Sequence, residues 1–128
     1  MGTRSFIGKM NPDNSITSVY CHFDGYPEHN GKILTTNYIT QQQVDCLLTC
    51  GDMSVLGPTL DQCSFYKDMG ERYIKAKDYE TLEQFIKDGQ EGWVEYFYVF
   101  NYDFWSCYNS DGKRIDLHET MEDDEEDD

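Results

Sequence analysis

The sequence predicts a fold of the α+β class, in which an antiparallel sheet of about four to six strands packs against about three helices. Alternating apolar and polar residues at both ends of the chain, bounded by turn residues, are typical of paired strands. The segments between them have apolar residues at helical spacing. Strands and helices are therefore grouped along the chain rather than interleaved one by one, and we expect an N-terminal hairpin and a C-terminal meander in one sheet.

The first hairpin is predicted from residues 4–10 (RSFIGKM) and 15–23 (SITSVYCHF). The linker NPDN, residues 11–14, contains the residue types that turns favour. Apolar residues occur at both alternating sets of positions in 15–23, so this strand is expected near the middle of the sheet.

The stretch YCHFDGYPEHNGKIL, residues 20–34, is interpreted as a strand that turns into a helix. The pair Asp24-Gly25 is a turn signal, Pro27 suits the first turn of a helix, and Glu28 is favoured there by the helix dipole. The helix is expected over residues 28–38.

A second helix is predicted after Thr40, because Thr40 and Gln43 have the spacing of a capping box and Gly51 follows as a terminator. Residues 52–62 are expected as a loop, CSFY at 63–66 as a short strand, and 67–78 as irregular.

A third helix is predicted over residues 78–89, with Asp78 or Thr81 as its cap and Gly89 as its terminator. Its buried face is expected to carry Leu82, Phe85 and Ile86, which have helical spacing.

The meander is predicted from residues 93–117. Trp93 to Phe100 holds eight positions with one charge, NYD can turn the chain, FWSCY returns, and NSDG leads into KRIDL. Residues 93–108 carry nine aromatic rings in sixteen positions. Such a pair of strands is either packed on both faces or offers aromatic side chains to a partner.

Length and charge divide the chain into two parts. The 128 residues suffice for one domain, and the formal net charge is −15. Residues 119–128 (ETMEDDEEDD) hold eight acids and no base, which leaves residues 1–118 with 17 acids against 10 lysines and arginines. We expect a single globular domain over 1–118 and a disordered acidic tail over 119–128.

Composition argues against several classes of function. No cluster of lysine and arginine offers a surface for a phosphate backbone, so direct nucleic-acid binding is not expected. No run of 18 apolar residues predicts a membrane span. Five cysteines, an odd number, and a start that lacks an apolar signal segment predict a reduced, cytoplasmic protein.

The sequence resembles a family of small uncharacterised proteins encoded by bacteriophages and prophages. The resemblance covers most of residues 2–108 and is carried by GTRS at 2–5, YCHFDGYPEH at 20–29, LLTCGDMSVLG at 47–57 and the aromatic segment 93–108. It implies a phage-encoded accessory protein acting in the host cytoplasm, and it implies no activity, cofactor or catalytic residue.

An enzyme is the alternative class, as a small zinc- or thiol-dependent protein centred on Cys21, His22 and His29. Zinc sites commonly use a Cys-x2-Cys pair, which this chain lacks, and adjacent strand residues such as Cys21 and His22 point to opposite faces. Cys46 and Cys50 are one helical turn apart, but free cysteines also serve as small apolar residues. We therefore expect no cofactor and no catalytic residue.

The favoured hypothesis is a non-enzymatic protein that binds and inhibits a host defence or nucleic-acid-handling protein with a basic surface. The chain is thus a candidate anti-restriction or anti-CRISPR protein, or a candidate nucleic-acid mimic. A homo-oligomeric phage structural or assembly component is a further alternative. The predicted partner-binding residues are His22, Asp24, Tyr26, Glu28, His29, Glu95, Tyr96, Tyr98, Tyr102, Asp103 and Trp105.

Overall fold

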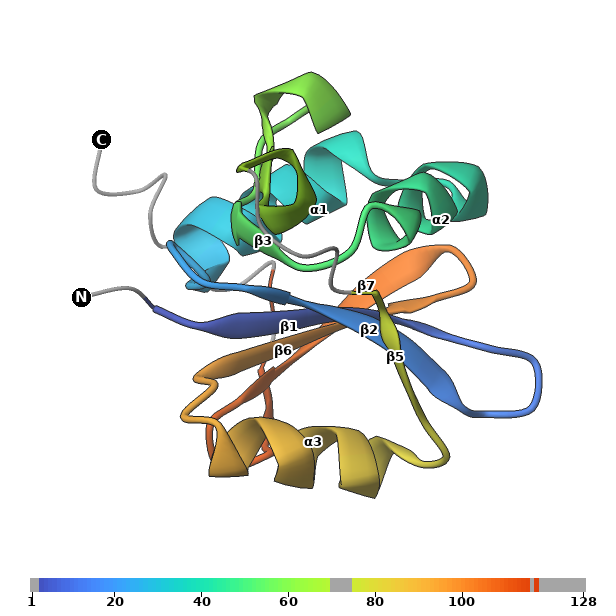
Figure 1. Ribbon diagram of the computed structural model, residues 1–128. Coiled ribbons are helices and arrows are strands. Elements are labelled where there is room, and N and C mark those ends of the chain that lie inside the picture. Colours follow the sequence, from blue (N-terminus) through green and yellow to red (C-terminus); the bar gives the residue numbers. More distant parts are fainter. Residues whose placement is uncertain (1–2, 70–74, 116, 118–128) are drawn as a thin grey trace.

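The protein has helices on both faces of one sheet, as the computed structural model in Figure 1 shows for residues 3–69, 75–115 and 117. The predicted α+β class is confirmed. In the described residues the sheet has eight strands, more than predicted. They are β1 Ser5–Met10, β2 Ile16–Cys21, β3 Met53–Val55, β4 Ser64–Phe65, β5 Lys77–Tyr79, β6 Tyr96–Asn101, β7 Phe104–Asn109 and β8 Arg114–Ile115.

Helices α1 and α2 lie on one face of the sheet and α3 on the other (Figure 1). Their bounds are α1 Lys32–Asn37, α2 Gln41–Thr49 and α3 Leu82–Glu91. A π-helical turn, η1 Pro27–Gly31, precedes α1, and two short 3₁₀ turns are η2 Leu60–Gln62 and η3 Tyr66–Met69.

The strand order is β4-β3-β2-β1-β6-β7-β8, with β5 paired to the same edge of β2 as β3. Both predicted hairpins form, β1–β2 and β6–β7, and β2 lies inside the sheet as expected. The purely antiparallel sheet is wrong, because β1 pairs with β6 in parallel and β2 pairs with β3 in parallel. Parallel neighbours need a long crossover, which local turn signals do not reveal.

The two long helices follow their capping signals with one exception. The Thr40 capping box forms with both of its hydrogen bonds, and Gly51 has a φ of 85° after the helix. Thr81 caps α3, but this helix continues past Gly89 to Glu91, and Gly92 is its C-cap. The prediction of Gly89 as a terminator is therefore wrong.

Two cores lie on the two faces of the sheet. The core under α1 and α2 includes Ile7, Tyr98 and Trp105, and the core over α3 includes Phe85 and Phe97. The alternation of β6 sends its rings into both cores. Most of the aromatic residues of β6 and β7 therefore pack inside the protein.

The part of the chain that the structure describes contains no helix long and apolar enough to cross a membrane. The predicted disordered tail, 119–128, falls outside the described residues.

Candidate functional site

The corner between β2 and η1 is held by buried polar contacts. The Asn30 side chain is fully buried, and its Nδ2 donates to Ser5 Oγ at 3.3 Å and to Cys21 Sγ at 3.4 Å. Gly25 N–H donates to the carbonyl oxygen of Thr3, and Tyr98 Oη donates to the carbonyl oxygen of Gly25 at 2.6 Å. These bonds tie the turn to the first strand and to β6.

The two histidines of this corner make local contacts. His22 Nδ1 lies 2.7 Å from Tyr20 Oη, and its ring packs edge-on against Phe23. His29 Nδ1 lies 2.9 Å from Asn30 Oδ1. Their partners are neighbours in the sequence, so the contacts support the structural interpretation of residues 20–34.

We expect Tyr98→Phe to lower the free energy of unfolding by about 1–3 kcal/mol, because the buried carbonyl of Gly25 would lose its hydrogen-bond donor. Tyr102→Phe is the matched control, since Tyr102 is exposed. Denaturant unfolding followed by far-UV circular dichroism measures both. Equal midpoints for the two variants would contradict this role of Tyr98.

The thiols of the sheet are protected from ionisation. Burial raises the pKa of Cys21 to about 11 and that of Cys107 to about 12. A thiol of this kind is a poor nucleophile at neutral pH, because the thiolate is the reactive form. Among residues 3–69, 75–115 and 117, no three His, Cys, Asp or Glu side chains are grouped to hold a metal ion.

Thiol labelling is expected to separate Cys46 from Cys21. Cys46 is exposed on α2, whereas Cys21 is buried and its raised pKa reduces its thiolate at neutral pH by about a hundredfold. Iodoacetamide at pH 7.5, followed by peptide mass spectrometry, should modify Cys46 first, and denaturant should abolish the difference. Cys21 labelling at the rate of Cys46 in the folded protein would revive the thiol-enzyme alternative.

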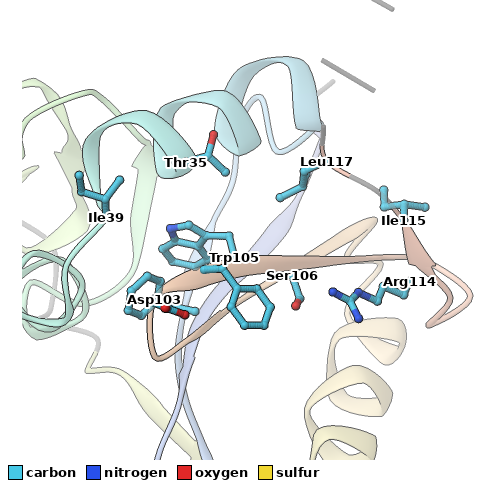
Figure 2. Close-up of a pocket in the computed structure, with 10 residues that line it drawn as sticks. Thr35, Ile39, Asp103, Trp105, Ser106, Arg114, Ile115 and Leu117 are labelled. Atoms are coloured by element: carbon cyan, nitrogen blue, oxygen red, sulfur yellow. The ribbon is translucent and has the colours of Figure 1, made fainter. Parts of the chain in front are cut away.

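A groove of about 630 Å³ lies beside β7, and we call it the edge groove (Figure 2). Its volume lies within the range typical of ligand sites. It is lined by Thr35, Ile39, Phe100, Asp103, Phe104, Trp105, Ser106, Arg114, Ile115 and Leu117.

The edge groove follows the outer edge of β7 and takes side chains from both faces of the sheet. Trp105 points toward α1, and Ser106 points the opposite way beside Arg114 (Figure 2). Trp105 Nε1 donates to the carbonyl oxygen of Tyr38 at 2.9 Å, and its ring packs on Phe100 at 5.2 Å between centroids. The base of the groove is therefore firmly held.

Large apolar side chains are exposed around this groove. Ile39 is 55% exposed and Phe104 is 48% exposed, and both line it. Tyr102, 53% exposed, lies in the adjoining turn of the β6–β7 hairpin. A gathering of exposed apolar residues beside a hollow is typical of an interaction site.

Charges of both signs flank the edge groove. Asp103 lies at the hairpin end and Arg114 lies beside Ser106. The ion pairs among the described residues are Lys9–Asp45 and Lys77–Asp88, so neither involves Arg114. Arg114 is thus available to a charged or polar group of a ligand.

The predicted partner-binding residues do not form one surface. Asp103 and Trp105 line the edge groove and Tyr102 lies next to it. Tyr98 is fully buried, so its assignment to a binding surface is wrong, and the ring of Trp105 is largely buried at 9% exposure. The reason is that both side chains point toward the helices α1 and α2.

The other predicted residues lie toward the start of β6, away from the hairpin turn that carries Tyr102 and Asp103. Burial, and then the nearby Glu28 carboxylate, raises the pKa of Tyr96, which places these two groups close together. Glu95 also contributes to that shift. This acidic corner is separated from Asn101 at the hairpin end by the length of β6, about 17 Å. The predicted residues of the turn between β2 and η1 and of η1 itself are His22, Asp24, Tyr26, Glu28 and His29, and those at the start of β6 are Glu95 and Tyr96.

The prediction missed Ile39, Phe104 and Arg114. Ile39 is an apolar residue directly before the Thr40 cap, where such residues usually pack on the helix that follows. The structure shows that Ile39 is exposed instead, which the sequence pattern does not indicate.

Comparisons of the chain with protein-family models, curated proteins and solved structures give no match.

Proposed function

We propose that the chain is a non-enzymatic binding protein that attaches to another protein through the edge groove. The observation that supports this most directly is that the exposed residues Ile39 and Phe104 line the edge groove and that exposed Tyr102 lies in the adjoining hairpin turn. Partner-binding surfaces combine such anchors with a polar rim.

The partner is a protein with a basic surface. Seventeen acids against ten bases in residues 1–118 give the body a net charge of −7, and the eight acids of 119–128 add to it. Such a field accelerates encounters with basic surfaces and repels the phosphate backbone of a nucleic acid. Together with the resemblance to phage proteins, this points to a host defence or nucleic-acid-handling protein in the host cytoplasm.

Affinity capture from a bacterial lysate tests this function. The immobilised wild-type chain should retain a basic protein, Ile39→Lys should retain at least about tenfold less, and Thr36→Lys should retain the wild-type amount. Thr36 is the matched control because it is exposed on α1 but does not line the edge groove.

Two further comparisons refine the result. Capture should weaken strongly between about 0.05 M and about 0.5 M salt, because screening shortens the reach of the acidic field. A chain ending at His118 shows whether the tail contributes. If no protein is retained, or if Ile39→Lys retains as much as wild type, the proposed function fails.

A further inference from the structure

Among the described residues, the outer edge of β7 is paired over only part of its length. β8 pairs with β7 only at Cys107 and Tyr108. Next to Phe104, Trp105 and Ser106, no described strand occupies this side. Open strand edges are templates for pairing with another chain, unless they are covered or blocked.

The backbone N–H and C=O of Trp105 face the stretch of this edge that no described strand pairs. Asn109 N–H donates to the carbonyl oxygen of Lys113 on the β8 side. Backbone groups of alternate residues in an antiparallel strand face the same neighbour, so Cys107 and Trp105 also face that side. Cys107 is opposite Ile115, whereas no described residue makes a backbone hydrogen bond to Trp105 there.

We propose that the edge groove binds an extended segment of the partner protein, which adds to β7 as a further strand. Trp105 N–H and C=O would exchange hydrogen bonds with the backbone of this guest strand. Its side chains would point alternately to the two faces of the sheet. This inference rests on the proposed function, because it supplies the way in which the partner is held.

The lining of the groove favours a strand over a compact ligand. On the α1 side the wall is apolar, with Ile39, Trp105 and Leu117. On the opposite side lie the hydroxyl of Ser106 and the guanidinium of Arg114. A guest strand with an apolar residue toward α1 and a hydrogen-bonding or acidic residue toward Arg114 matches both walls.

The net charge distinguishes among the possible occupants. A second copy of this chain brings the same acidic field, and the segment 119–128 has eight acids and only Met121 as a large apolar residue. Neither matches a groove with an apolar wall and Asp103 at its hairpin end. A basic partner protein with an exposed extended segment satisfies the apolar wall, Arg114 and Asp103 together.

The probe for this proposal is a set of peptides selected from a random ten-residue library against the full chain. Binding is followed by the fluorescence of Trp105 in a Trp93→Phe background, because the chain has two tryptophans. Ile39→Lys should weaken the selected peptides at least about tenfold and Thr36→Lys by less than about twofold. Arg114→Ala should also weaken them, and Lys113→Ala, the neighbouring control, should not.

N-methylation of the selected peptide distinguishes strand addition from other modes of binding. N–H groups of an extended guest point alternately toward β7 and away from it. Methylating those that face Trp105 should weaken binding at least about tenfold, and methylating their neighbours should leave it nearly unchanged. The proposal is overturned if the effect does not alternate, or if selection yields no peptide that Ile39→Lys weakens.

Two other outcomes would also overturn it. In the first, the wild-type mass doubles in sedimentation and Ile39→Lys prevents this, so the occupant is a second copy. In the second, removal of residues 119–128 alone shifts Trp105 emission, so the occupant is the chain's own end.

If no peptide binds but lysate capture still depends on Ile39, the proposed function stands and the added strand is ruled out. If peptides bind as an added strand but no lysate protein is captured, the groove accepts a strand and the proposed function fails.

Discussion

Gly89→Ala is expected to destabilise the protein by about 3 kcal/mol or more, although alanine is normally the better helix former. A Cβ at position 89 would lie 2.5 Å from Phe97 Cζ, closer still to Cε2, and 3.2 Å from a ring carbon of Phe6. Phe97 is fully buried among other rings, including Phe85 at 5.5 Å, so it has no free space to move into. Overpacking of this kind exceeds the gain in helix propensity.

Gly92→Ala is the matched control, because the nearest atoms to a Cβ there are at 3.7 Å and the backbone φ is −96°. Its free energy of unfolding should stay within about 0.5 kcal/mol of the wild-type value. Adding Phe97→Leu to Gly89→Ala should recover part of the loss, since the two sites are in contact. Equal denaturant midpoints for the Gly89 and Gly92 variants would contradict the close packing of α3 on β6.

Gly89 also shows where prediction from the sequence ends. A glycine near the end of a helical pattern is a usual terminator, and only the position of the Phe97 ring reveals its other role. By contrast, the Thr40 capping box and the β6–β7 hairpin could be predicted, because their signals lie within a few residues of each other. Local chemistry was sufficient for these elements.

The pairing of distant segments could not be predicted. Nothing in residues 5–10 or 96–101 indicates that β1 and β6 are parallel neighbours, because periodicity gives a strand its faces but not its partners. The same limit applies to the short strands β3, which was expected as loop, and β5, which was expected partly as irregular structure and partly as the start of the third helix. Their pairing with β2 defines them.

The candidate site was predicted only in part for the same reason. The aromatic content of residues 93–108 drew attention to the hairpin that carries Asp103 and Trp105, two residues that line the edge groove. Ile39 comes from the α1–α2 connection and Arg114 from β8, so the edge groove exists only after three separate segments meet. The alternation of apolar and polar residues within one strand cannot show which parts of its edge are paired with another strand.

Trp105→Ala is expected to lower the free energy of unfolding by about 3–5 kcal/mol. The ring is 9% exposed, packs on Phe100, and donates through Nε1 to the carbonyl oxygen of Tyr38, which joins β7 to the end of α1. Trp93→Ala is the control, since Trp93 is 78% exposed and its removal should change stability by less than about 0.5 kcal/mol. Urea unfolding followed by circular dichroism measures both.

This contrast determines how the binding experiments must be interpreted. Trp105 forms the base of the edge groove and part of the core, so loss of binding in Trp105→Ala would follow from unfolding alone. Ile39 and Phe104 are about half exposed at the rim, and their replacement by lysine should remove binding while the unfolding midpoint stays close to the wild-type value. A fall in stability equal to that of Trp105→Ala would place these rim residues in the core and remove the basis of the proposed site.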